Sequence, residues 1–368
     1  MSASARAATP AAVGVGIIGA GILGARHARV FSELPAARCV AVADPDEQRA
    51  ATVAARHGAR AFSDHAEMLE TLGPRGSGEI SAVAVATPDY LHRGPVCDAI
   101  AAGVDVLVEK PLAMTPLDAR AMIETADAHG RVLMVNYSQR WLPEHRRIAT
   151  LLEDGTLGAP AFVESHRWDA AWVPERMISW AAHTTPIHFM SSHDIDLILH
   201  WLGERVETVS AVAHRGALSQ SRDVRETVDG YVALLRLRNG TAVSLHSSWI
   251  LPDTFPAAAD ASLQLLGSRG SVWLDGNARE MRLFTPTHSE RLTFGGPVTA
   301  TEVNGRLEGA FTESLGAFLA AVRDRVLDTP TSARRTLHVV EVQDAIVRAA
   351  ESGRVVTLSA DGDPATSP

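Results

Sequence analysis

Three glycines at fixed spacing give the chain a turn that could hold a phosphate. A short apolar strand leads into the motif G-x-G-x-x-G, formed by Gly19, Gly21 and Gly24. The first glycine allows a tight turn, the second lets backbone N–H groups approach a pyrophosphate, and the third lets a helix pack closely on a strand. The positive end of the following helix would face the phosphates. The motif therefore predicts a dinucleotide site, to which Ile22 and Leu23 of the same turn also contribute.

A carboxylate follows at the distance that such a site requires. Asp44 ends the second apolar segment, about 20 residues after the last glycine, where a carboxylate can bind the ribose hydroxyls and repel the 2′-phosphate of NADP. Arg49, one turn into the next helix, is the one feature that favours NADP. We therefore expect NAD as the cofactor. An ordinary β-turn in an α/β domain is the alternative interpretation of the glycines.

A lysine stands at the end of another predicted strand. Glu109 and Lys110 follow the apolar segment 104–108, and the carboxyl ends of parallel strands form the ligand-binding edge of such a sheet. A partly desolvated lysine has a lowered pKa and can carry a proton or hold a substrate hydroxyl. Lys110 is therefore the candidate acid–base group, and both Glu109 and Lys110 are expected beside the nicotinamide of the cofactor. A solvated surface pair is the alternative.

The strand before it ends in a second candidate segment. Thr87 and Pro88 follow the apolar run 80–86, and His92 lies one turn into the next helix. Pro88 could form a wall of the nucleotide pocket or only end the strand. His92 could contact the cofactor or be an ordinary solvated helix residue. We include all three among the candidate cofactor-binding residues.

The elements that must position these side chains divide the chain into two parts. Strands alternate with helices over residues 13–136, which predicts an α/β domain with a doubly wound parallel sheet of the Rossmann type. Residues 1–12 are expected to form a disordered tail. From residue 137 to 368 we expect an α+β domain with a predominantly antiparallel, open sheet. One helix is predicted to begin near Pro186 and to end at Gly203, and Asn239-Gly240 predicts a hairpin with a type I′ turn.

Composition limits the classes of partner. The chain has 368 residues, 46% of them hydrophobic, and a formal net charge of −9, which argues against nucleic acid and acidic membranes as partners. No apolar run is long enough to span a membrane, and the two cysteines, Cys39 and Cys97, suggest neither a disulfide nor a metal site. We expect a cytoplasmic protein. Both faces of residues 231–249 are apolar, which predicts a homodimer or homotetramer.

The order of the motifs resembles the glucose-fructose oxidoreductase/inositol dehydrogenase (Gfo/Idh/MocA) family. The segments GAGILG, ATPDYLH and AGVDVLVEKPLA occur in that order, with Asp44 between the first two. The resemblance implies a Rossmann domain, a substrate-binding α+β domain and NAD(P)-dependent chemistry on a sugar or cyclitol hydroxyl. It implies that Lys110 is the catalytic lysine, that His193 in HDIDLILHWLG is the catalytic histidine, and that Arg140 in NYSQR is the characteristic arginine of the cofactor site.

One residue departs from the family pattern. The family often carries an aspartate four residues before the histidine, and this chain has Phe189 there. Asp196, three residues after His193, could partly replace it or have a structural role. Tyr137, His183 and Phe189 are expected to join Lys110 and His193 in binding the substrate. The histidines at 183, 188 and 193 are five residues apart, which does not place them on one helical face, so we expect no metal site.

These residues favour one function over two alternatives. The leading hypothesis is an NAD-dependent oxidoreductase that transfers a hydride between nicotinamide and a secondary hydroxyl or ketone of a sugar, sugar derivative or cyclitol. A family variant that reduces an imine, or that uses NAD in a redox-neutral hydrolysis or elimination, is the second. A non-enzymatic NAD(H)-sensing regulator is the third, and the presence of both Lys110 and His193 argues against it.

Overall fold

The amino-terminal part of the chain forms a parallel sheet with helices on both faces. The structure is a computed structural model that describes residues 12–218, 227–296 and 298–359, so nearly all of the expected tail lies outside the described residues. The six strands have the order β3-β2-β1-β4-β5-β6, which is that of a dinucleotide-binding sheet. They are β1 (Val13–Ile18), β2 (Ala37–Ala43), β3 (Arg60–Phe62), β4 (Ala82–Val85), β5 (Asp105–Val108) and β6 (Leu133–Val135), and the helices are α1 (Ile22–Glu33), α2 (Glu47–His57), α3 (His65–Leu72), α4 (Arg93–Ala101) and α5 (Pro116–His129).

The carboxyl-terminal part forms a larger, mostly antiparallel sheet, as the sequence predicts. Its order is β14-β13-β12-β11-β7-β10-β9-β8-β17, and only the pairing of β10 with β7 is parallel. Its strands are β7 (Pro160–Ala170), β8 (Val206–His214), β9 (Gly230–Leu237), β10 (Ala242–Leu251), β11 (Ala259–Gly267), β12 (Ser271–Asp275), β13 (Glu280–Phe284), β14 (Ser289–Thr293) and β17 (Val356–Thr357). A small separate hairpin joins β15 (Thr301–Val303) and β16 (Arg306–Glu308).

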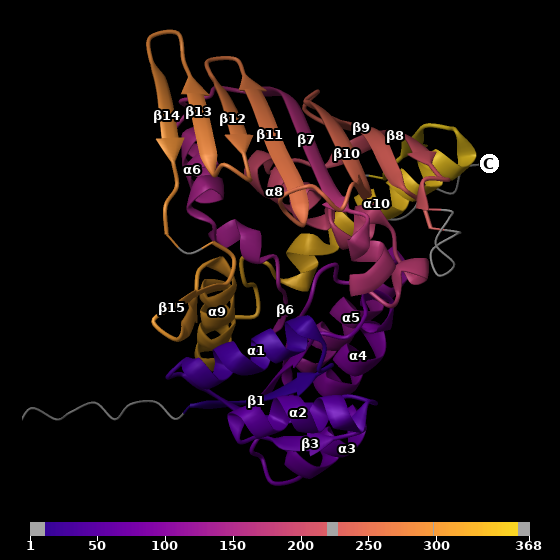
Figure 1. Cartoon of the computed structure of the whole chain (residues 1–368), viewed down its shortest axis with the longest axis vertical. Coiled ribbons are helices and arrows are strands. Elements are labelled where there is room, and N and C mark those ends of the chain that lie inside the picture. Colours follow the sequence, from indigo (N-terminus) through magenta and orange to yellow (C-terminus); the bar gives the residue numbers. More distant parts are fainter. Residues whose placement is uncertain (1–11, 219–226, 297, 360–368) are drawn as a thin grey trace, which may run out of the picture.

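Helices lie between the two sheets. In Figure 1, α10 (Ala333–Ser352) runs along the lower side of the large sheet towards α5 of the parallel sheet, and α8 (Ser192–Leu202) lies behind the large sheet. The helices of this part are α6 (Pro143–Glu153), α7 (Pro186–Phe189), α8 (Ser192–Leu202), α9 (Ala310–Asp324) and α10 (Ala333–Ser352), with short turns η1 (Asp89–Leu91), η2 (Ser138–Trp141), η3 (Val173–Met177) and η4 (Ala181–His183). Within the ranges the structure describes, no helix combines the length and apolar character needed to cross a bilayer.

Helix α9 returns to the first sheet. Its residues Phe311, Leu315 and Phe318 share a hydrophobic cluster with Val15 and Ile17 of β1. The core of the parallel sheet is therefore completed by a helix almost 300 residues downstream in the chain. The division that we propose at residue 137 separates the two sheets but not their two cores.

The β9–β10 hairpin forms as expected, but its turn is not type I′. A type I′ turn needs a positive φ at both central residues, whereas only Gly240, with φ of 89°, has one. The amide of Gly240 donates to the carbonyl of Leu237, and the amide of Leu237 donates to that of Thr241. The loop is thus one residue longer, and its glycine takes the left-handed position typical of a three-residue hairpin loop.

The single helix predicted from Pro186 to Gly203 is wrong. Helix α7 ends at Phe189 and α8 begins at Ser192. At the break the amide of Ser191 donates five residues back, to Pro186, and the amide of His193 donates only three residues back, to Met190. The apolar periodicity continues through this interruption, so it did not reveal the break.

Candidate active site

The glycine turn is built for close approach of another molecule. A Cβ on Gly19 would lie 2.6 Å from the carbonyl oxygen of Ala86, and one on Gly24 would lie 1.8 Å from that of Gly19. A Cβ on Gly21 would meet nothing within 4 Å, so this glycine faces open space at the start of α1. Helix α1 has no side-chain cap, and its first N–H groups are therefore available to an anion. Ile22, 64% exposed, stands beside them.

Asp44 braces this turn. One carboxylate oxygen accepts a hydrogen bond from the amide of Ala20 at 2.7 Å, and the other accepts from the amide of Asp46 at 2.9 Å. Arg49 lies 3.6 Å from Asp44 and 2.9 Å from Asp46. Two carboxylates thus face one guanidinium, so the edge at which a ribose would bind stays negative.

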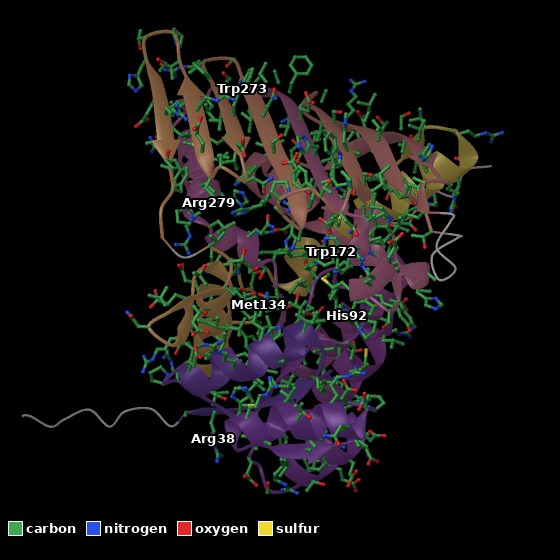
Figure 2. The ribbon with its side chains drawn as sticks, in the orientation of Figure 1. Arg38, His92, Met134, Trp172, Trp273 and Arg279 are labelled. Carbon is green, nitrogen blue, oxygen red and sulfur yellow. The ribbon has the colours of Figure 1, made fainter. Side chains whose placement is uncertain are left out.

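His92 connects two candidate segments. Its Nδ1 lies 2.9 Å from the carbonyl oxygen of Pro111, and its Nε2 lies 3.2 Å from that of Thr87. The ring is buried, and burial lowers its pKa. These two contacts connect the two strand-end loops through His92, which lies on the side of the first domain that faces the rest of the chain (Figure 2). The hydroxyl of Thr87 is buried and has no hydrogen-bond partner among the described residues, which fits a ligand beside Pro88.

The carboxylate of Glu109 turns into the protein. Its Oε1 lies 2.8 Å from His27 Nε2 and accepts a hydrogen bond from Asn136 at 2.8 Å. Ser314 of α9 donates to the same Asn136 at 2.8 Å. Burial alone would raise the pKa of Glu109, but His27, Asn136 and Lys110 outweigh it and lower the pKa. Sequence reasoning missed His27 and Ser314, whose role depends on contacts that span 82 and 178 residues.

Lys110 is the only lysine in the chain. Lysines and arginines number 34 in total, so the other 33 are arginines, and arginines stay protonated in proteins. Lys110 Nζ donates to the carbonyl oxygen of Phe189 at 2.5 Å and lies 4.5 Å from the centre of the Phe189 ring. Burial lowers the pKa of Lys110, opposed by the charges of Glu109, Asp89 and Asp169. The one amine side chain of the protein thus stands where a proton could be exchanged.

The break between α7 and α8 makes the contact with Lys110 possible. In a continuous helix the amide of His193 would donate to the carbonyl of Phe189, four residues earlier. Here it donates to Met190 instead. The carbonyl oxygen of Phe189 is therefore free to accept from Lys110 Nζ, and the ring of Phe189 occupies the place beside it.

His193 lies at the start of α8, next to Tyr137. The two rings are 6.1 Å apart, edge to face. His193 Nδ1 and the Tyr137 hydroxyl are buried without hydrogen-bond partners in the part of the chain that the structure describes. Burial, then the positive charges of Lys110 and Arg167, hold the pKa of His193 well below its ordinary value. The imidazole is therefore neutral at pH 7, and these two unpartnered groups fit a polar substrate.

Two arginine–aspartate pairs hold the first turns of α8 in place. Arg140 donates to both carboxylate oxygens of Asp196, at 2.7 and 2.5 Å, and Asp196 is 1% exposed. Arg167 of β7 does the same with Asp194, at 2.8 and 2.9 Å. The structure thus commits Arg140 to Asp196, which supports the structural interpretation of that aspartate.

The other two candidate histidines have partners different from those of His193. His188 is buried, with Nδ1 2.9 Å from the hydroxyl of Thr185, and burial lowers its pKa. His183 is exposed and packs on the ring of Tyr90 at 4.9 Å. Of the expected substrate residues, the structure therefore brings together Lys110 with Phe189, and His193 with Tyr137.

Strand β7 carries site residues that sequence reasoning missed. Val163, Ser165, Arg167 and Asp169 alternate along the face turned towards the helices. Because side chains alternate in a strand, these odd-numbered positions share one face. The sequence signal that could have revealed the site is that two charged residues, Arg167 and Asp169, follow on the same face as the buried Val163. Asp169, 8% exposed, lies near Lys110, Arg167 and Asp194.

Comparison with known proteins agrees with this geometry over both parts of the chain. Residues 13–137 match the sequence model of an "oxidoreductase family, NAD-binding Rossmann fold", and residues 149–358 match the C-terminal alpha/beta domain of the same family. The chain belongs to the Gfo/Idh/MocA family. As an oxidoreductase of this family it binds NAD, and the open space at Gly21 and the uncapped start of α1 fit that cofactor.

Individual Gfo/Idh/MocA relatives differ in activity. The chain is 30% identical over 267 residues to inositol 2-dehydrogenase 1 of Saccharopolyspora erythraea, covering 71% of this chain and 74% of that one. It is 32% identical over 212 residues to 2,7-anhydro-N-acetylneuraminate hydratase of Mediterraneibacter gnavus, covering 55% and 54%. The crystal structure of myo-inositol 2-dehydrogenase from Lactobacillus plantarum shares the fold, with a TM-score of 0.78, 19% identity, and coverage of 95% and 100%.

Proposed function

We propose that this protein is an NAD-dependent dehydrogenase that acts on a secondary hydroxyl of a sugar, sugar derivative or cyclitol. The observation that carries the proposal is the position of Lys110, the only lysine, at the end of β5 with a lowered pKa. The relatives named for inositol oxidation support the substrate class. When bound, NAD supplies the acceptor for the hydride that leaves the carbinol carbon.

In this proposal Lys110 and His193 handle the hydroxyl group. A neutral Lys110 amine takes the hydroxyl proton as the carbonyl forms, and the reverse reaction returns it. His193, held neutral by burial, donates or accepts a hydrogen bond at the same oxygen and fixes its direction. Tyr137 adds a buried hydroxyl beside it. These groups position the carbinol, which is the larger part of what the protein contributes.

The proposed function is tested by offering NAD and a panel of polyols, cyclitols and sugars to the purified protein. Formation of NADH, followed by its absorbance, is the expected result for at least one member of the panel. A substrate consumed without net NADH would instead favour a redox-neutral reaction, for which the 2,7-anhydro-N-acetylneuraminate hydratase among the relatives is the specific reason. NADH binding without conversion of any substrate or of an imine would favour the regulator.

We predict that NAD is preferred over NADP by at least about tenfold in kcat/KM. Asp44 and Asp46 together outweigh the single charge of Arg49, so a 2′-phosphate would be repelled. A repulsion of only about 1.4 kcal/mol gives a tenfold preference. Steady-state kinetics with both cofactors at a fixed substrate concentration measure the ratio, and equal values would contradict the role of Asp44.

The outer face of the large sheet supports the proposal of a homodimer or homotetramer. Phe162 and Leu234 are 60% and 59% exposed there, and they line a groove of about 690 Å³. Glu164 and Arg236, of opposite charge, lie in the same groove, so the face is suited to pair with itself about a two-fold axis. Soluble monomers rarely expose an apolar patch of this kind. A second copy of the chain is therefore the proposed occupant.

Light scattering is expected to give two or four times the chain mass of 39.2 kDa at micromolar concentration. Leu234→Glu places a charge in the proposed interface and is expected to lower the mass to that of the single chain. Val326→Glu is the matched control, since Val326 is 47% exposed in the segment after α9, away from the sheet. A wild-type mass near 39 kDa would rule the assembly out.

A further inference from the structure

The substitution of Phe189 leaves the site without the carboxylate that the family often places before the histidine. A phenyl ring accepts no proton and forms no strong hydrogen bond to a hydroxyl. Its ring instead lies against Lys110 Nζ, at 4.5 Å. A lysine that takes a proton becomes an ammonium ion, whose charge must be balanced in a buried place. The carboxylates near Lys110 are therefore the candidates to balance this charge and to accept a hydrogen bond from a substrate hydroxyl.

Two of the carboxylates near Lys110 are already committed. Glu109 is held by His27 and Asn136, both at 2.8 Å. Asp89 accepts a hydrogen bond from the hydroxyl of Thr184 at 2.6 Å and another from the amide of Tyr90 at 3.0 Å. The charges of both act on Lys110, but protein donors engage both carboxylates, so neither is free to meet a substrate.

The two aspartates of α8 that flank the site are committed as well. Asp194 binds Arg167 through both oxygens, and Asp196 binds Arg140 in the same way. A bidentate pair with a guanidinium is the strongest of these arrangements. These aspartates therefore orient α8, and they offer little to a ligand.

Asp169 is the remaining carboxylate. It lies near the end of β7, opposite Ala259 of β11, and it is 8% exposed. Among the residues that the structure describes, no side chain or backbone group makes a hydrogen bond to its carboxylate. It shares the inner face of β7 with Arg167, and its charge acts on Lys110.

We propose that Asp169 replaces the missing carboxylate: it accepts a hydrogen bond from a substrate hydroxyl beside Lys110 and stabilises the ammonium form of Lys110. This inference rests on the proposed function. In alcohol oxidation the carbinol C–H bond breaks and its hydride goes to NAD. The O–H proton goes to Lys110 Nζ, and the carbon–oxygen bond becomes a carbonyl. Asp169 keeps its charge throughout, next to the new ammonium ion.

The charged groups around Asp169 define its protonation. Arg167 on β7, Lys110 after β5 and Asp194 on α8 are the charges that act on it, and Lys110 and Arg167 also act on His193. Burial raises the pKa of Asp169 to about 6, although Arg167 and Lys110 act in the opposite direction. The carboxylate is thus ionised above about pH 6 and protonated below it.

The test compares Asp169→Asn with the wild type and with a control. We expect Asp169→Asn to lower kcat/KM by about tenfold to a hundredfold, the usual effect of losing a hydrogen bond to a charged group. In the wild type, kcat/KM for oxidation should fall by an additional tenfold per pH unit below about pH 6, because the pKa of Asp169 lies there. This additional fall should be absent from Asp169→Asn, and Asp169→Glu should restore it.

Asp260→Asn is the matched control. Asp260 lies on the neighbouring strand β11, opposite Trp168, and its partners are His166 and Asn277 on the outer side. Its replacement should leave kcat/KM and the pH profile unchanged. NADH binding and thermal unfolding, measured for every variant, separate a local effect from misfolding. Unchanged kcat/KM and pH profile in Asp169→Asn would overturn the inference.

A second measurement does not depend on turnover. Because Lys110 is the only lysine, trace acetylation across a pH series, read by mass spectrometry, reports the pKa of a single side chain. Asp169→Asn removes a negative charge that raises this pKa, so the pKa should fall in Asp169→Asn and stay unchanged in Asp260→Asn. An unchanged pKa in both variants would overturn the inference. A lowered pKa in a protein that oxidises no alcohol would contradict the proposed function and still support the coupling of Asp169 to Lys110.

Discussion

Lys110→Met is expected to lower kcat by about 10²–10⁴, the range typical of a lost acid–base group, and to leave NADH affinity nearly unchanged. Methionine has about the length of lysine but cannot take a proton. The phosphates of the cofactor would be held by the turn at Gly19–Gly24 and the start of α1, which Lys110 does not contact. Stopped-flow or steady-state kinetics at saturating NAD and substrate measure kcat, and fluorescence titration measures NADH affinity.

Two further variants make this result specific. Lys110→Arg keeps the charge but cannot give up a proton near neutral pH, so its kcat should be as low as that of Lys110→Met. Arg93→Met removes an exposed cation that pairs with Asp118 and should change neither quantity. Loss of NADH binding with normal kcat at saturation would show that Lys110 serves cofactor binding and not proton transfer.

His193→Ala is expected to lower kcat by about a hundredfold or more, whereas His188→Ala should cost less than about tenfold. His193 lies beside Tyr137 with an unpartnered, buried Nδ1, and its pKa is held well below its ordinary value by burial. Its neutral ring can therefore direct the reacting oxygen over the whole neutral range. The Nδ1 of His188 is engaged by Thr185, the N-cap of α7, although its Nε2 is also buried without a partner among the described residues.

The three histidine variants have to be measured together. His188 is buried, so His188→Ala can lower stability, and the thermal unfolding temperature and NADH affinity are needed beside kcat. His188→Asn keeps a polar group beside Thr185 and is the milder control. His183→Ala removes an exposed ring that packs on Tyr90 and should have an effect mainly on KM. Near-normal kcat in His193→Ala, with loss of activity in His183→Ala or His188→Ala, would show that the catalytic role belongs to that other histidine and not to His193.

Much of the fold could be predicted from the sequence because its signals are local. The G-x-G-x-x-G spacing determines the turn between β1 and α1, since a Cβ at Gly19 or Gly24 would clash with the backbone. Both ends of helix α5 are determined by neighbouring residues, because Thr115 caps its start and Gly130 takes the left-handed conformation at its end. Alternation of strands and helices dictates a parallel sheet, and strand direction then places Lys110 at the ligand edge. These rules act within about 30 residues.

The partners of the site residues could not be predicted in this way. Glu109 binds His27 and Lys110 binds Phe189 across 82 and 79 residues, and the break that frees the carbonyl of Phe189 leaves the apolar pattern of α7 and α8 intact. The charges of Asp169 and Lys110 act on each other although the two residues lie 59 positions apart, on strands of different sheets. Sequence alone determined which side chains stand at the ends of strands. Tertiary packing decided which of those side chains are hydrogen-bonded to other parts of the protein and which have no such partner. This availability depends on burial and on contacts between segments that are distant in the sequence.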